Sequence, residues 1–141
     1  MSIHFNFAEI DEFSLQRRNI KNWIKNCTVN EERKLGDIQY IFCSDPYLLK
    51  INKKFLNHDY LTDIVTFDYD KNDIISGDVF ISIDRIKENS AIYKVSFYNE
   101  LLRVIIHGIL HLIGYNDKSD SEKKIMREKE NYYLSLYSDK I

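Results

Sequence analysis

An apolar run that ends in two histidines constrains the fold of this chain more than any other segment. Residues 101–106, Leu-Leu-Arg-Val-Ile-Ile, lead directly into His107-Gly-Ile-Leu-His111. The run predicts a helix in the core, where an unpartnered imidazole would be costly. The histidines are four residues apart, so both rings lie on one face of that helix, one turn apart. The segment therefore predicts a buried helix that carries a polar site.

The residues after the histidines complete a candidate metal-binding set. Gly114 tolerates a positive φ and can end the helix, and Asp117 can then return toward the two rings. Two neutral imidazoles and one carboxylate leave a fourth tetrahedral position open, as a catalytic zinc requires. Histidines at this spacing also occur by chance as packed or solvated residues, but the added glycine and aspartate favour a metal. We therefore expect His107, His111 and Asp117 to bind one zinc ion per chain.

Length and composition predict one domain that spans residues 1–141. The chain is long enough for a sizeable core, and its ten tyrosines and eight phenylalanines are not typical of a disordered sequence. A net charge of −2 argues against a generally basic nucleic-acid binder, so any RNA contact requires a local basic patch. No apolar run is long enough to span a membrane, and the N-terminus lacks the layout of a signal peptide. We therefore expect a cytoplasmic protein in which Cys27 and Cys43 are reduced core residues.

Periodicity and capping signals predict a mixed arrangement of helices and strands. The expected strands are 3–7, 37–43, 63–69 and 77–83. Three helices are expected at about residues 11–27, 44–55 and 84–93. A fourth is capped by Ser96 and leads into the histidines. A fifth begins with a capping box at Ser119 and Glu122 and ends at about residue 137. This pattern predicts an α+β fold, a small mixed four-stranded sheet flanked by about five helices, with the metal site at the end of a central helix.

The histidine segment resembles the signature of the YbeY family of bacterial ribosomal RNA maturation factors, described as zinc-dependent endoribonucleases. That signature reads His-Gly-x-Leu-His-Leu-x-Gly-Tyr-Asp-His, and every fixed position from His107 to Tyr115 matches. Met126 stands where the family has a methionine, and residues 62–67 and 77–82 resemble two family strands. The resemblance implies a single-strand-specific endoribonuclease that acts in ribosomal RNA maturation and ribosome quality control. Its implied partners are a ribosomal RNA precursor and small-subunit ribosomal proteins.

One departure from the family pattern concerns the substrate. Leu56 follows residues 51–55, Ile-Asn-Lys-Lys-Phe, where the family has an arginine. If that arginine holds an anionic substrate, another cation must do so here, and Lys53, Lys54 and His58 are near in sequence. We expect these three residues to bind RNA phosphate, the alternative being that they are ordinary surface residues. A separate basic stripe, formed by Arg17, Lys21 and Lys25, is expected on the first helix.

Other residues near the histidines limit the chemistry. The family's Asp-His is replaced here by Asn116-Asp117. Asp117 supplies a carboxylate as third ligand, and Asn116 puts an amide, which does not titrate, in place of the family's aspartate. Zinc proteases usually have a glutamate directly after the first histidine, so Gly108 disfavours peptide hydrolysis. Glu100 lies two turns before His107 and is our candidate to orient it or to act as general base, unless it is an exposed first-turn carboxylate. We expect a zinc-dependent endoribonuclease; the alternatives are a metalloprotease-like hydrolase and a ribosome-associated metal-binding factor with weak or no catalysis.

Overall fold

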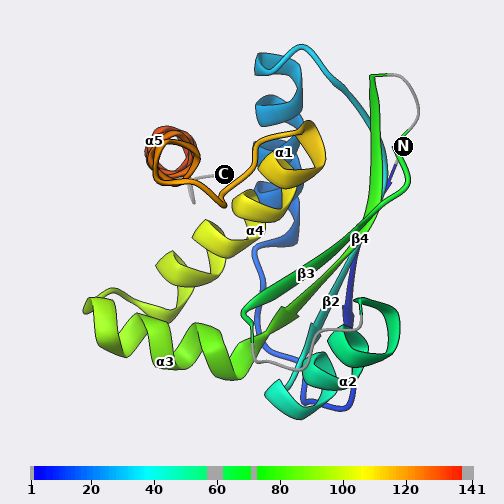
Figure 1. Cartoon of the computed structure of the whole chain (residues 1–141), viewed down its shortest axis with the longest axis vertical. Helices are drawn as coiled ribbons and strands as arrows, with labels where there is room; N and C mark the ends of the chain where they lie inside the picture. The colour runs from blue at the N-terminus through cyan, green and yellow to red at the C-terminus, as the bar shows by residue number, and fades with distance from the viewer. Residues whose placement is uncertain (1, 57–61, 71–72, 138–141) are drawn as a thin grey trace.

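The computed structural model describes residues 2–56, 62–70 and 73–137, and in these residues the chain forms four strands and five helices (Figure 1). In chain order they are β1 (Ser2–Phe7), α1 (Arg17–Asn30), β2 (Lys34–Cys43), α2 (Asp45–Leu56), β3 (Ile64–Asp68), β4 (Ile74–Ser82), α3 (Ile83–Tyr93), α4 (Phe97–Ile113) and α5 (Asp120–Leu136). The predicted α+β fold, a mixed four-stranded sheet flanked by five helices, is confirmed.

The sheet has the strand order β1-β2-β4-β3. β1, β2 and β4 are parallel, and β3 runs antiparallel to β4 at one edge. Parallel neighbours need a crossover connection, which α1 supplies between β1 and β2. The strand order makes β2 and β4 the interior strands. Tyr40 of β2, for example, pairs with Phe5 of β1 on one side and with Val79 of β4 on the other.

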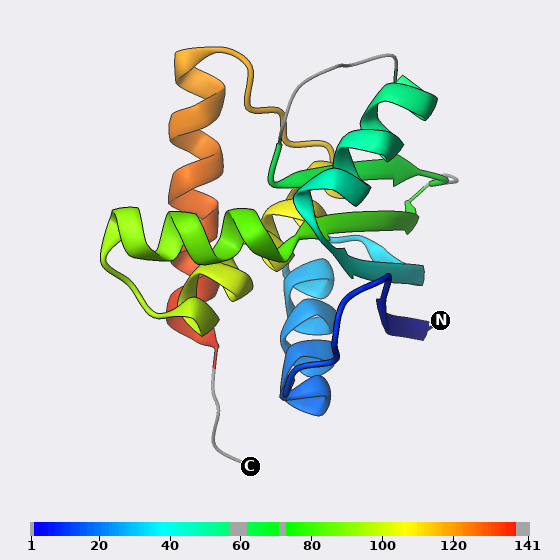
Figure 2. The same cartoon turned by 90° about the horizontal axis from the view of Figure 1, so that it is seen from below.

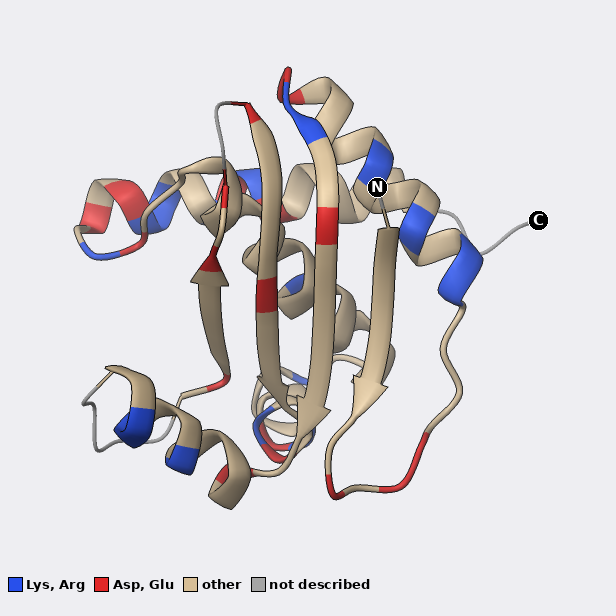
Figure 3. Ribbon diagram, turned by 90° about the vertical axis from the view of Figure 1, so that its right-hand side faces the viewer, with Lys and Arg blue, Asp and Glu red and all other residues tan. Residues whose placement is uncertain are grey.

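The two faces of the sheet are covered unequally. One face packs against α1 and α4 and forms the main core, to which Ile38, Tyr40 and Ile81 belong. The other face, turned toward the viewer in Figure 3, carries α2 over its β3 side. There Leu48 of α2 packs with Val65 of β3 in a smaller cluster. Figure 2 shows α1 and α2 on opposite sides of the strands, and α3 and α5 beyond the sheet.

α4 is buried on almost every side. Its residues from Glu100 to Leu112 are buried except for a narrow strip formed by Arg103, His107 and His111, which are partly exposed. Gly108 allows a close approach to the sheet, because a Cβ there would lie 2.9 Å from Val79 Cγ1. Despite its apolar sequence, neither α4 nor any other described helix is long and apolar enough to cross a membrane. The packing of α4 therefore turns the two histidines toward its one partly exposed strip.

The capping signals predicted from sequence are present. Ser96 accepts a hydrogen bond from Asn99 N and begins α4, and Ser119 and Glu122 form the predicted capping box of α5. Side chains that satisfy the first free N–H groups of a helix fix where it begins. The cap at Ser119 thus sets the end of the segment that lies between the histidines and α5.

The predicted start of the first helix is wrong, because α1 begins at Arg17 rather than near residue 11. Phe13 lies before the helix, and its ring makes edge contacts with Phe7 at 5.0 Å and Phe97 at 5.7 Å. Phe13 is therefore apolar because it packs against β1 and α4 from a connecting segment. Tertiary contacts of this kind are not visible in helical periodicity.

Both cysteines are free and buried, and burial raises the pKa of each thiol to about 12. A thiol that stays protonated at neutral pH is a poor nucleophile and a poor metal ligand. Cys27 packs in the main core and Cys43 in the cluster under α2. Both are structural residues, as expected from their isolated positions in the sequence.

Gly77 provides a test of the sheet geometry. A Cβ on this residue of β4 would lie 2.4 Å from the backbone oxygen of Phe67 in β3. A carbonyl in a paired strand cannot rotate away cheaply, so we expect Gly77→Ala to lower the free energy of unfolding by about 1–3 kcal/mol. Urea unfolding followed by circular dichroism measures the change. An unchanged midpoint would mean that β3 can shift along α4 without cost.

Candidate metal centre

The end of α4 and the start of α5 place three polar side chains together. α4 ends at Ile113 and is capped by Gly114, which has a φ of +123° that few other residues adopt. Its N–H donates to the backbone oxygens of Leu110 and His111, and Tyr115 N donates to Leu110 O. The chain then turns back before Ser119 begins α5. This short connection returns Asp117 to the two histidine rings.

The three predicted ligand atoms converge on one point. Asp117 Oδ2 lies 3.3 Å from His107 Nε2 and 3.4 Å from His111 Nε2. The ligand atoms of the three residues all lie within 4.8 Å of one another. Two ligands about 2.0–2.1 Å from a tetrahedral zinc are roughly 3.3 Å apart, so the donor set fits such an ion. His107, His111 and Asp117 could therefore hold a metal ion together.

Hydrogen bonds fix which ring nitrogen of each histidine is available. His107 Nδ1 lies 2.6 Å from Glu130 Oε2, and His111 Nδ1 lies 3.0 Å from the backbone oxygen of Tyr115. Both partners are acceptors, so each Nδ1 carries a proton, and in the neutral ring Nε2 is the nitrogen whose lone pair faces Asp117. Partners of this kind orient a ligand ring before a metal arrives.

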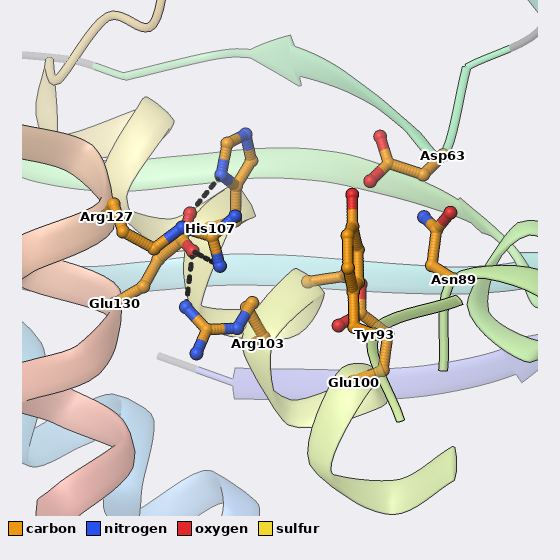
Figure 4. A pocket seen from close by; sticks show the side chains of 9 residues that line it. Asp63, Asn89, Tyr93, Glu100, Arg103, His107, Arg127 and Glu130 are labelled. Carbon is orange, nitrogen blue, oxygen red and sulfur yellow. Dashed lines mark hydrogen bonds and ion pairs between the residues drawn. The ribbon is translucent and has the colours of Figure 1, made fainter. Parts of the chain in front are cut away.

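Glu130 is the residue that orients His107, and it was not predicted from the sequence. It is a buried residue of α5 that also accepts a hydrogen bond from Arg103 Nη1 at 2.9 Å (Figure 4). Burial alone would raise the pKa of Glu130, but the hydrogen bonds from His107 and Arg103 hold it below its usual range. Glu130 follows Met126 at helical spacing on the buried face of α5, which is the only signal that the sequence offered.

A second carboxylate, that of the partly buried Glu31, supports the residue whose carbonyl holds His111. Glu31 lies directly after the end of α1, and the Tyr115 hydroxyl donates a hydrogen bond to its Oε1 at 2.6 Å. Lys129 of α5 reaches Glu31 Oε2 at 3.1 Å, and the hydroxyl of Tyr133 also donates to this carboxylate. These contacts hold the pKa of Glu31 below its usual range although burial opposes them. Glu31, directly after α1, and residues of α5 thus anchor the turn that carries Tyr115.

Glu100 lies near His107 but does not orient it. It is buried in the first turn of α4 and lines a cavity of about 130 Å³. The cavity is also lined by Asp63, Asn89, Tyr93, Arg103, Val104, His107, Arg127 and Glu130 (Figure 4). Burial raises the pKa of Glu100. The position next to His107 Nδ1 belongs to Glu130, so Glu100 is left as a candidate acid or base within the cavity.

The predicted phosphate contacts lie elsewhere in the structure. Lys53 and Lys54 are exposed in the last turn of α2, which packs on the sheet face opposite to α4. His58 lies outside the described residues. The described structure therefore does not bring Lys53 and Lys54 into the group formed by His107, His111 and Asp117. The basic stripe is exposed on α1, whose Lys and Arg positions are blue beside β1 in Figure 3.

The fold and the site together define an α+β protein with a candidate three-ligand metal centre at the end of its central helix. The family model described as Endoribonuclease YbeY matches residues 5–138. The chain belongs to the YbeY family.

Relatives and a solved structure support this assignment. A protein named Endoribonuclease YbeY from Flavobacterium psychrophilum is 48% identical over 135 residues, which is 96% of each chain. One of the same name from Azobacteroides pseudotrichonymphae is 54% identical over 86% of this chain and 87% of its own. The solution structure of TM1509 from Thermotoga maritima superimposes with a TM-score of 0.67 and 28% identity, covering 95% of this chain and 87% of that one.

Removal of one ligand tests the metal centre. We expect His111→Ala to lose stoichiometric metal and the stability that metal binding adds, because the ion binds the folded state. His4→Ala is the matched control, since His4 is exposed on β1. Elemental analysis and thermal unfolding with and without chelator measure both effects. Full metal occupancy in His111→Ala would exclude this residue as a ligand.

The role of Glu130 can be tested separately. Glu130→Gln keeps the shape of the side chain and removes the charge that orients His107, so metal affinity should fall about 10–100-fold. Competition with a chromophoric chelator measures the affinity. Glu128→Gln, an exposed position on the same helix, is the control. Equal affinities in all three proteins would show that His107 needs no carboxylate partner.

Proposed function

We propose that this chain is a zinc-dependent, single-strand-specific endoribonuclease that acts in ribosomal RNA maturation and ribosome quality control in the cytoplasm. Its substrate would be a ribosomal RNA precursor, and small-subunit ribosomal proteins would be its partners. The observation that carries the proposal is the convergence of His107, His111 and Asp117 with both ring tautomers fixed. The endoribonuclease name of the curated relatives supplies the substrate class.

The donor set supports zinc as the ion. Two imidazole nitrogens and one carboxylate oxygen suit zinc and leave a coordination position open. An ion held there would supply Lewis-acid chemistry toward water and a phosphoryl oxygen. The contribution of the chain is to hold the two Nε2 lone pairs and the Asp117 carboxylate in one place. Glu130 and the carbonyl of Tyr115 keep the ring protons away from that point.

Glu100 is the best candidate for proton transfer. Its carboxyl group lines the same cavity as His107. Within the described residues it makes no side-chain hydrogen bond and no ion pair, so it is not committed to a structural partner. Burial raises the pKa of Glu100, which favours a carboxyl group that can take up and release a proton. Asn116 occupies the family's aspartate position and cannot take this role.

Peptide hydrolysis fits the site less well. A glutamate directly after the first histidine is the usual general base of a zinc protease, and that position here is Gly108. Any side chain at residue 108 would meet Val79, since even a Cβ would lie 2.9 Å from its Cγ1. The packing of α4 against β4 therefore opposes a glutamate at this place. A ribosome-associated factor without catalysis is the rival that the activity measurement below must exclude.

Cleavage of RNA by the purified protein tests the proposal. We expect the metal-loaded protein to cut single-stranded RNA, to lose activity on removal of metal by a chelator, and to regain it with zinc. Glu100→Gln should keep its metal and lower kcat by about 10²–10⁴-fold, because general acid–base catalysis contributes that much. Gel analysis of labelled RNA and elemental analysis provide the two readouts.

The controls separate the alternatives. Glu128→Gln, exposed on α5, should cleave as the unaltered protein does. Casein offered under the same conditions tests for protease activity. Stoichiometric metal without any RNA cleavage would favour the binding factor, and cleavage that survives complete metal removal would overturn the proposed mechanism.

A further inference from the structure

α5 presents two cations beside the metal centre that no sequence motif indicated. Lys123, Met126, Arg127 and Glu130 follow the spacing i, i+3, i+4, i+7 and form one stripe along the helix. With His107 and Asp117 they line a groove of about 260 Å³. Met126 and Glu130 are buried at its base, whereas Lys123 and Arg127 are exposed at its margin. The groove therefore opens to solvent between two positive side chains.

These cations are only weakly committed to partners within the protein. Among the described residues Lys123 pairs with no carboxylate, and Arg127 lies 3.7 Å from Glu130 Oε1, which already accepts the closer hydrogen bond from Arg103. The side chain of Arg127 is 55% exposed. By contrast, Lys129 on the same helix is tied to Glu31. Lys123 and Arg127 can therefore turn toward an anion at little cost.

A second cavity beside His107 has a mixed lining. This cavity carries the carboxylates of Asp63 and Glu100 and the polar side chains of Asn89 and Tyr93, and Arg103 and Arg127 also line it (Figure 4). Phosphate groups gather at cations, where their counterions are released. Arg103 already donates to Glu130 at 2.9 Å, so it is less available to a phosphate than Lys123 and Arg127. A polyanion that reaches the metal centre thus meets its most available cations at Lys123 and Arg127.

We propose that Lys123 and Arg127 hold the backbone phosphates of the RNA strand next to the metal centre. The inference rests on the proposed function, since it names the part of the chain that binds the same substrate. Residues at i and i+4 have Cβ atoms about 5–6 Å apart, so the two long side chains can contact neighbouring phosphates of one strand. They take the role that the sequence pattern favoured for Lys53, Lys54 and His58.

Binding across a salt series tests the inference. The probe is a fluorescent single-stranded oligoribonucleotide with 2′-O-methyl groups, titrated with metal-loaded protein and followed by anisotropy. For single strands the slope of log affinity against log salt falls by roughly 0.7 for each phosphate that the protein no longer neutralises. Lys123→Ala and Arg127→Ala should each weaken binding, and the double variant should lower the slope by about 1.4, which corresponds to two phosphates. Metal content should stay stoichiometric.

Matched variants make the outcome specific. Lys124→Ala removes an exposed lysine of α5 that lies outside the groove and should leave the slope unchanged. Arg127→Lys keeps the charge and should retain the slope of the unaltered protein. If the double variant gives the same curve as the unaltered protein, or if Lys53→Ala with Lys54→Ala alone lowers the slope, the inference is overturned.

Failure of the proposed function would look different. If the unaltered protein binds the probe through Lys123 and Arg127 but cleaves no unmodified RNA, the phosphate site stands and the endoribonuclease proposal falls. If it cleaves RNA and the double variant does so with unchanged KM and salt dependence, the activity stands and the assignment of these two residues falls.

Discussion

Close packing of α4 against β3 and β4 determines where the polar chemistry of this protein can lie. Gly108 permits this packing, because a Cβ there would press on Val79. Once the helix is this close, nearly every side chain between Glu100 and Leu112 is buried, and only the strip of Arg103, His107 and His111 reaches partly open space. The packing of α4 on the sheet at Gly108 therefore also places the two histidines. It excludes a large side chain directly after His107.

The candidate ligands are held by partners that come from distant parts of the chain. Glu130 on α5 fixes the ring of His107. Glu31, directly after α1, accepts a hydrogen bond from the Tyr115 hydroxyl, and the backbone carbonyl of Tyr115 holds the ring of His111. Both carboxylates are shielded from water and paired with cations, Arg103 and Lys129 respectively. Buried charges need such partners, since an unpaired one is strongly unfavourable. The site is thus oriented before any ion binds, which lowers the cost of assembling the ligands around it.

Charge is distributed unevenly around His107, and this explains how a chain with a net charge of −2 could bind RNA. The cavity on one side holds the carboxylates of Asp63 and Glu100 together with Arg103 and Arg127, and the groove along α5 adds the exposed Lys123 to Arg127. The first arrangement suits proton transfer and polar contacts, and the second suits phosphates. A local field of this kind needs no overall positive charge, because screening in salt limits each interaction to nearby groups.

Local features of the protein could be predicted from its residues alone: the i, i+4 histidines, the helix end at Gly114, the caps at Ser96 and Ser119, and the class of fold. Each cap and each spacing depends on residues within a few positions of one another, where backbone preference acts directly. Tertiary packing was needed to establish that Phe13 lies outside α1, that Glu130 rather than Glu100 partners His107, and that Lys53 and Lys54 lie on the far face of the sheet. Those outcomes depend on which helices meet, and contacts between elements far apart in sequence follow from packing of the whole core rather than from any local pattern.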